Sequence, residues 1–251
     1  MDQNKELALA IEAATRAGDY LRSKKDICVD LSEGKDLKLS SDKASERIII
    51  DILSQTGLQC LSEEAGLVGE KSDKYWIIDP LDGSVNYYRG INEYCCVSVA
   101  LWENGAPVLG VINRFMQNEM YVGEVGKGAS LNGKVICTSD AISTSESIMA
   151  SGFPVKRQYD DKSLSRFVKR VQSFKKIRMF GAAAVSGAFV ASGKVDAYFE
   201  EEIMLWDIAG ATAIVKAAGG SCEVELLDDY KCNCRLFATE ALKEDYHVKS
   251  L

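Results

Sequence analysis

Acidic side chains recur at the ends of short apolar segments, where their carboxylates could converge on a cation. The stretch WIIDPLDGS at 76–84 has strand character and delivers Asp79 to its end, with Asp82 three residues later. Glu63 and Asp207 each follow another short apolar stretch. Together the cluster would carry about four negative charges, and like charges that close raise one another's pKa unless a cation compensates. Mg²⁺ prefers such oxygen ligands and normally works together with a substrate phosphate.

A purely structural interpretation of the same motif competes with this one. Asp beside Pro and Gly commonly caps a turn, so Asp79 and Asp82 could each simply bind a backbone amide. Pro80 lacks the N–H that a strand ladder needs, which predicts that the strand stops there. The sequence Asp82-Gly83-Ser84 then predicts a sharp turn into a short helix. Spacing alone leaves both interpretations open.

Histidine and cysteine usage narrows the chemistry. His247 is the single histidine among 251 residues and lies close to the C-terminus, which disfavours Ser-His-Asp and Cys-His catalysis and zinc sites built on paired histidines. The eight cysteines are scattered and form no pair of CxxC motifs, so we expect reduced thiols. An enzyme of this composition must use carboxylates, hydroxyls, lysines or metals.

Charge and hydropathy limit the partners. Lys and Arg number 30 against 37 Asp and Glu, and this net charge of −7 disfavours a nucleic-acid partner. No window approaches the roughly 20 apolar residues of a membrane span, and the N-terminal segment lacks the basic-then-apolar pattern of a signal peptide. We therefore expect a cytoplasmic protein without membrane attachment.

Apolar periodicity predicts the elements that position these residues. Helical spacing predicts helices over about 5–25 and 42–54, the second capped by Asp42. Short apolar runs broken by glycine turns predict strands between about 75 and 138. The second half alternates strands with helices, which are expected near 161–173, 181–193 and 206–218. Helices between strands imply an α/β sandwich, in which layers of helix cover sheets.

Nothing in the sequence marks a flexible boundary between domains. There is no internal repeat, low-complexity tract or Pro/Gly/Ser linker. We therefore expect residues 1–251 to form a single domain of two closely packed lobes, about 1–140 and about 141–251. The first lobe is predicted to be rich in sheet, and the second lobe is predicted to alternate strands with helices.

The chain resembles the inositol monophosphatase family of lithium-sensitive, magnesium-dependent phosphatases over most of its length. The motifs that carry the resemblance are LSEE at 61–64, WIIDPLDGS at 76–84 followed by Asn86-Tyr87, GAAA at 181–184, LWDIAG at 205–210 and AGG at 218–220. The combination in this order is highly specific. It implies a layered αβαβα sandwich, also seen in fructose-1,6-bisphosphatase, and the hydrolysis of phosphoric monoesters. It also implies a homodimer.

The resemblance further implies a site for two or three Mg²⁺ ions. Glu63, Asp79 and the carbonyl of Leu81 would hold the first ion. Asp79, Asp82 and Asp207 would hold the second. Glu63, together with metal-bound waters, would host a third. Two such ions can activate a water and neutralise the leaving alkoxide without a histidine.

The resemblance assigns the reacting water and the phosphate to neighbouring residues. Gly83 and Ser84 look like the phosphate cradle, because free backbone N–H groups where a helix opens favour an anion. Asp42 matches the family acid that, with the hydroxyl of Ser84, orients and deprotonates the attacking water. Ser84 stands where many relatives have Thr, and the stretch 35–42 only loosely matches the family pattern.

Substrate choice is expected at residues further along the chain. Glu200 can accept hydrogen bonds from a polyol, although Glu200-Glu201-Glu202 can equally be a solvated charge run. The small residues of 181–193 are first of all those of a close-packing helix. The positions that the resemblance places against the substrate are Asp82, Gly83, Ser84, Gly181, Ala182, Ala183, Glu200 and Asp207.

We therefore expect a Mg²⁺-dependent phosphomonoesterase that acts on a small polyol or sugar phosphate such as inositol 1-phosphate. One alternative is a 3′(2′),5′-bisphosphate nucleotide phosphatase, although Asn86-Tyr87 favours the inositol and sugar branch. A second alternative is a catalytically silent binding protein on the same fold. An acidic calcium-binding module is disfavoured because no DxDxDG loop occurs.

Overall fold

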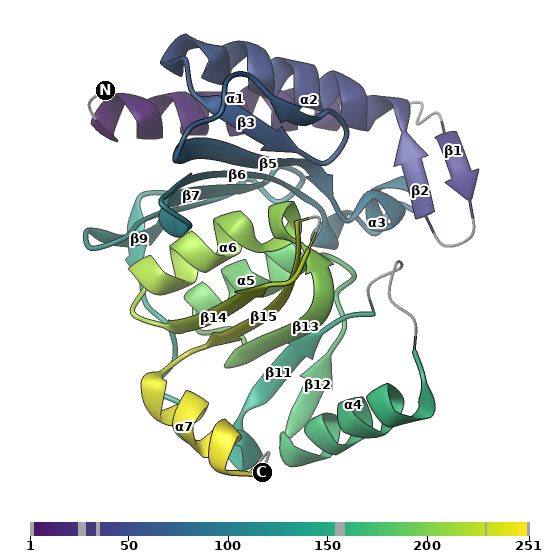
Figure 1. Ribbon diagram of the computed structural model, residues 1–251, viewed down its shortest axis with the longest axis vertical. Coiled ribbons are helices and arrows are strands. Elements are labelled where there is room, and N and C mark those ends of the chain that lie inside the picture. Colours follow the sequence, from purple (N-terminus) through teal and green to yellow (C-terminus); the bar gives the residue numbers. More distant parts are fainter. Residues whose placement is uncertain (1–2, 25–28, 34–35, 154–158, 229, 250–251) are drawn as a thin grey trace.

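The computed structural model describes residues 3–24, 29–33, 36–153, 159–228 and 230–249. Figure 1 shows its elements stacked in layers, with helices α1 and α2 above a large sheet and helices α5 and α6 below that sheet. A second sheet follows, with α4 and α7 at its far side. The order is helix, sheet, helix, sheet, helix, which confirms the expected αβαβα sandwich.

The helices and strands follow the expected alternation in the second half. The helices are α1 (Gln3–Ser23), α2 (Ser40–Leu53), α3 (Ser84–Tyr88), α4 (Asp161–Ser173), α5 (Ala183–Ala191), α6 (Leu205–Ala217) and α7 (Glu240–Lys249). The strands are β1 (Val29–Glu33), β2 (Asp36–Leu39), β3 (Gln59–Ser62), β4 (Gly66–Val68), β5 (Lys74–Asp82), β6 (Cys96–Glu103), β7 (Ala106–Arg114), β8 (Glu119–Glu124), β9 (Gly128–Leu131), β10 (Lys134–Ile136), β11 (Ile148–Ser151), β12 (Lys176–Arg178), β13 (Ala197–Met204), β14 (Ser221–Leu226) and β15 (Lys231–Phe237).

The sheets are built from separate halves of the chain. In the described residues, the larger sheet has the order β10-β9-β8-β7-β6-β5-β3-β4 and the smaller one β12-β11-β13-β15-β14. Most pairs are antiparallel, but β3 runs parallel to β5, and β11 runs parallel to both of its neighbours. The carboxyl ends of β3 and β5 therefore lie side by side. Glu63 follows the first of these ends, and Asp79 lies near the second. The division into two lobes of one domain stays a prediction.

Small residues allow helices α5 and α6 to fill the space between the sheets. Every residue of α5 is buried, and a Cβ built on Gly187 would lie 2.3 Å from the Cβ of Ala211 in α6. A Cβ on Gly110 of β7 would likewise lie 2.4 Å from the carbonyl oxygen of Gly210. Because Cβ atoms do not approach this closely, only glycine permits this separation. The prediction that 181–193 forms a close-packing helix is confirmed.

Two local expectations are wrong. Strand β5 continues through Pro80 to Asp82, with a shift in its pairing to β6. Pro80 fits because the extra residue at the shift leaves its nitrogen outside the ladder. Asp42 lies within the first turn of α2 instead of before it, and its Oδ2 accepts the N–H of Leu39 at 2.9 Å, which caps the helix from inside.

Two chemical features of the described residues bear on the expectations above. Within these ranges no helix is long and apolar enough to cross a bilayer. The seven cysteines that the structure describes all carry free thiols, whereas Cys28 lies outside the described residues.

Candidate active site

The irregularity in β5 brings two carboxylates to the same face of the sheet. Asp79 pairs with Ser98 of β6, and Asp82 pairs with Cys96, so three residues of β5 span two of its partner. In a regular strand an odd separation would point the two side chains to opposite faces. The additional residue therefore turns Asp82 to the face that Asp79 occupies.

Both carboxylates accept backbone N–H groups. Asp79 Oδ1 accepts the N–H of Leu81 at 3.0 Å, as the turn interpretation predicts. Asp82 instead reaches the start of α5, where it accepts the N–H groups of Ala183 at 3.2 Å and Ala184 at 2.8 Å. These amides would otherwise be unpaired at the helix terminus, so Asp82 fixes α5 against β5.

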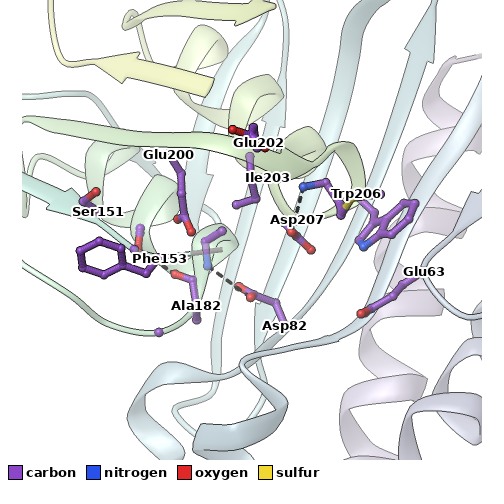
Figure 2. A pocket seen from close by; sticks show the side chains of 15 residues that line it. Glu63, Asp82, Ser151, Phe153, Ala182, Glu200, Glu202, Ile203, Trp206 and Asp207 are labelled. Carbon is purple, nitrogen blue, oxygen red and sulfur yellow. Dashed lines mark hydrogen bonds between the residues drawn. The ribbon is translucent and has the colours of Figure 1, made fainter. Parts of the chain in front are cut away.

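The other two acidic residues come from different elements. Asp207 lies in the first turn of α6, and its Oδ2 accepts the N–H of Met204 at 3.3 Å. Glu63 lies on the turn that joins β3 to β4. Figure 2 shows the carboxylates of Glu63, Asp82 and Asp207 pointing into the same space. The predicted convergence of these three side chains is therefore present.

Burial and mutual repulsion raise the pKa values of these acids. Burial raises the pKa of Asp79 well above its ordinary value, and the charges of Glu63, Asp82 and Asp207 raise it further. Burial likewise raises the pKa of Asp207, with Glu63 and Asp82 adding to the effect. The pKa of Asp82 is raised to about 6 by burial, against the lowering effect of the α5 amides. A buried cluster of this kind is destabilising for the ionised protein unless a cation joins it.

The carboxylates face one another without forming a finished coordination shell. Among the residues that the structure describes, no group of three His, Cys, Asp or Glu side chains is already arranged to hold a metal ion. Charges raise one another's pKa over longer distances than those of metal coordination. The raised pKa values are therefore compatible with carboxylates that are not yet close enough to share an ion.

The acidic cluster opens into a cavity of about 260 Å³. Seven of the residues predicted from sequence line it, namely Glu63, Asp82, Gly181, Ala182, Ala183, Glu200 and Asp207. Five others, Asp42, Asp79, Leu81, Gly83 and Ser84, are not part of the lining. Asp79 is almost completely buried, and the charges of the lining acids Glu63, Asp82 and Asp207 raise its pKa.

The residues expected at the phosphate and the water are held by short-range contacts. The hydroxyl of Ser84 donates to the carbonyl of Leu81 at 2.9 Å, the same oxygen that the family resemblance assigns to a metal. Gly83 has a φ of 81°, and a Cβ there would lie 2.4 Å from the carbonyl oxygen of Tyr94. Only glycine therefore fits the turn into α3. Asp42 is buried, and the hydroxyl of Ser45 on the same helix donates to the carbonyl of Pro80 at 2.8 Å.

Glu200 lines the cavity and is not part of a solvated charge run. The hydroxyl of Tyr198, a fully buried residue, donates to Glu200 Oε2 at 2.5 Å. Burial raises the pKa of Glu200 to about 7, with a smaller contribution from the charge of Asp82. Its neighbour Glu201 forms an ion pair with Arg170 of α4. The interpretation as a solvated run is wrong for these positions.

Several lining residues were not found from sequence. Ser151, Gly152 and Phe153, at the end of β11, form a wall of the cavity. The remainder of this group are Ser186, Glu202, Ile203, Met204 and Trp206. The small residues Ser151-Gly152 after an apolar strand were the available signal, because β11 runs parallel to β13 and its end must lie beside Glu200.

Comparison with known proteins places the chain in a family. The model of the inositol monophosphatase family matches residues 2–224, and the chain belongs to that family. The Nus factor SuhB of Escherichia coli K12 is 34% identical over 222 residues, covering 85% of this chain and 83% of that protein. A Thermotoga maritima fructose-1,6-bisphosphatase/inositol-1-monophosphatase is 36% identical over 188 residues, covering 74% of this chain and 70% of that protein. The solved structure of inositol monophosphatase from Anabaena superimposes with a TM-score of 0.86 at 29% identity, covering 100% of this chain and 96% of that one.

Proposed function

We propose that this protein is a Mg²⁺-dependent phosphomonoesterase that hydrolyses a small polyol or sugar phosphate. The observation that carries the proposal is a set of mutually repelling carboxylates at one end of the cavity. Glu63, Asp82 and Asp207 line the cavity, and Asp79 is buried close to them. The family membership supports phosphatase chemistry of the same kind.

The donor set fits a hard divalent cation. All the acidic side chains of the cluster offer oxygen, and the family resemblance adds the carbonyl oxygen of Leu81, two residues after Asp79. The raised pKa values of Asp79 and Asp207 show the cost of ionising the cluster, which a divalent charge would remove. Oxygen ligands at this density suit Mg²⁺ better than the thiolate- and imidazole-binding metals.

Each residue then has a defined task. Glu63, Asp79 and Leu81 would hold one ion, and Asp79, Asp82 and Asp207 a second. When bound, two or three Mg²⁺ ions lower the pKa of water and neutralise charge on the phosphate and the leaving oxygen.

The groups next to the acidic cluster act on the water and the phosphate. Asp42 and the hydroxyl of Ser84 orient the attacking water, and Asp42 takes its proton. For this, the Ser84 hydroxyl must exchange its present acceptor, the Leu81 carbonyl, for the water. The backbone N–H groups at Gly83 and Ser84 bind the phosphate oxygens and stabilise the charge that develops on them.

The polar wall opposite the acidic cluster supports a polyol as the rest of the substrate. Glu200 accepts hydrogen bonds from hydroxyls, and Tyr198 fixes its carboxylate in place. The hydroxyl-bearing residues Ser151 and Ser186 line the same cavity, so several positions can exchange hydrogen bonds with a hydroxylated ring. The loop at Gly181 closes this side of the cavity.

One observation favours the nucleotide alternative. Phe153 lines the cavity with nearly half of its side chain exposed, and its ring packs against Tyr159 and Phe167 at centroid distances of 5.1 and 4.6 Å. An exposed, supported ring can stack on a nucleobase, which a 3′(2′),5′-bisphosphate nucleotide would supply.

A phosphate-release screen tests these functions. Purified protein is incubated with inositol, hexose, heptose, histidinol and nucleotide phosphates, with and without Mg²⁺. The proposal expects release only with Mg²⁺, inhibition by Li⁺, and preference for a polyol or sugar ester. Preference for adenosine 3′,5′-bisphosphate would support the nucleotide alternative. Folded protein that binds Mg²⁺ but is inactive on the whole panel would support a binding role. The Escherichia coli relative is likewise named as a Nus factor and not as a phosphatase.

We also propose that the protein works in the cytoplasm as a homodimer. The family resemblance supports a dimer, and Val85, Tyr88 and Ile91 expose large apolar side chains on and just after α3. Light scattering on a gel-filtration column should give twice the 27.5 kDa of one chain. A mass equal to one chain at micromolar concentration would contradict the dimer.

A further inference from the structure

Glu46, on helix α2, holds the turn that carries Glu63. Its side chain is buried, and its Oε1 accepts the Ser62 hydroxyl, the N–H of Glu64 at 3.2 Å and the N–H of Ala65 at 2.9 Å. The residues on both sides of Glu63 are therefore bound to one carboxylate oxygen of another element.

The turn depends on this contact because few other elements support it. Ser62 ends β3, and the following strand β4 has only three residues, Gly66–Val68, at the edge of the sheet. Without Glu46 the Ser62 hydroxyl and the N–H groups of Glu64 and Ala65 would lose this acceptor. The Ser62 hydroxyl is buried, and a buried donor without an acceptor is costly. The turn would have to change its conformation to give these donors new acceptors, and Glu63 would move with it.

We infer that Glu46 is a positioning residue that fixes the turn at Glu63 and thereby sets the affinity of the acidic cluster for Mg²⁺. The inference rests on the proposed function, because Glu63 matters only if it is a ligand. Side chains that orient ligands from behind commonly change metal affinity by about 10–100-fold when removed. Glu46 holds three donors at once, so it belongs to the strong end of that class.

Glu46 could also act through its charge alone, and two variants separate the possibilities. Glu46→Gln keeps an Oε1 acceptor for all three donors and removes the charge. Glu46→Ala removes both. The positioning role therefore expects Glu46→Gln to behave like the parent protein and Glu46→Ala to lose affinity.

A matched control comes from the same layer of the fold. Glu6 of α1 is as buried as Glu46 and pairs with Lys74, but it has no hydrogen bond to the turn at Glu63. Glu6→Ala should lower the melting temperature and leave Mg²⁺ affinity unchanged. Ser62→Ala removes one of the three donors and should weaken binding by about threefold, a smaller loss than the 10–100-fold change expected for the whole contact.

The experiment is isothermal titration of Mg²⁺ into each metal-free protein, with the rise in melting temperature on adding Mg²⁺ as a second readout. The expected result is a dissociation constant about 10–100-fold higher than the parent's for Glu46→Ala, and equal to the parent's for Glu46→Gln. If Glu46→Ala does not fold, Ser62→Ala and Glu46→Gln decide the outcome by the same criteria.

Three results would overturn the inference. Unchanged Mg²⁺ affinity in Glu46→Ala, or in Ser62→Ala where Glu46→Ala does not fold, would leave only a structural role. A loss in Glu46→Gln equal to that in Glu46→Ala would assign the effect to charge. If the parent protein itself does not bind Mg²⁺, the proposed function fails together with the inference. If the parent protein binds Mg²⁺ and releases phosphate, the first of these results would overturn the inference and leave the proposed function intact.

Discussion

The side-chain amide of Asn86 donates to the backbone carbonyl of Phe180 at 2.8 Å. The same nitrogen lies 2.8 Å from the carbonyl of Tyr94 and 3.3 Å from that of Gly181. One side chain of α3 thus ties the turn expected to bind phosphate to the loop that lines the cavity before α5. The two walls of the site are held at a fixed separation.

Removing this amide should loosen the site. Asn86→Ala leaves the carbonyls of Tyr94 and Phe180 without this donor, and we expect a loss of about 1–3 kcal/mol in unfolding free energy with a raised KM. Asn86→Asp places an acceptor against three other acceptors and should be worse. Urea unfolding and phosphate-release kinetics measure both effects. An Asn86→Ala variant as stable as the parent would show that the carbonyls find other donors.

Asp79→Asn should separate stability from activity. Asparagine keeps an oxygen that can accept the N–H of Leu81, but it removes a buried charge repelled by Glu63, Asp82 and Asp207. We expect the melting temperature of the metal-free protein to rise and phosphate release to fall at least about 100-fold, because the proposed function makes Asp79 a ligand shared by two metal ions. Asp19→Asn, on the exposed side of α1, serves as the control. A metal-free variant less stable than the parent would contradict the repulsion argument.

Gly152→Ala should disturb the substrate pocket through Glu200. A Cβ at this position would lie 2.7 and 2.8 Å from the two carboxylate oxygens of Glu200, so the carboxylate must move away from Tyr198. We expect KM for a polyol phosphate to rise about tenfold, the equivalent of one lost hydrogen bond, while Mg²⁺ affinity stays unchanged. Kinetics over a range of substrate and Mg²⁺ concentrations measures KM for the polyol phosphate and the Mg²⁺ requirement separately. A changed Mg²⁺ requirement with constant KM would be the opposite of this expectation.

Stability of the metal-free protein should fall as the pH rises, and Glu200 should contribute to the fall. Its pKa is about 7 in the folded protein against 4.5 ordinarily, so the folded state binds more protons between these values. That contribution is fully present below about pH 4.5 and is lost as the pH rises through 7. Glu200→Gln should therefore gain stability relative to the parent between pH 5 and pH 8, on the order of 1 kcal/mol.

Urea unfolding in the presence of a chelator, at both pH values, measures this difference. Glu103→Gln, on an exposed side chain at the end of β6, is the control and should follow the parent at each pH. A parent and a Glu200→Gln variant with the same pH dependence would contradict the raised pKa.

The convergence of the acidic residues could be predicted because each follows a recognisable apolar segment. Glu63 directly follows β3, Asp82 ends β5 of the same sheet, and Asp207 lies in the first turn of a helix packed on that sheet, so local patterns were enough to predict them. The sequence also predicts that Asp42 caps α2. Its carboxylate does cap the helix, but from within the first turn. The helical C-terminus, α7, carries only a weak apolar periodicity and was not anticipated.

The wall around Glu200 could not be predicted in the same way. It depends on the pairing of β11 with β13 and on a bulge in β13, where Glu202 adopts a φ of 59°. A left-handed glutamate has no sequence signal, because it is imposed by the pairing with β15. The hydrogen bond from Glu202 N–H to Asn233, 31 residues away, illustrates the same dependence on tertiary structure.

Helix α6 touches both sheets and carries Asp207 at its first turn. A substitution in this helix would have to be accommodated in both sheets at once, so the acidic end of the cavity tolerates little change. The bulge of β13 and the end of β11 are less enclosed, since Glu202 and Phe153 retain exposed surface. A new ligand preference should therefore arise by replacement at this rim, while the acidic end stays the same.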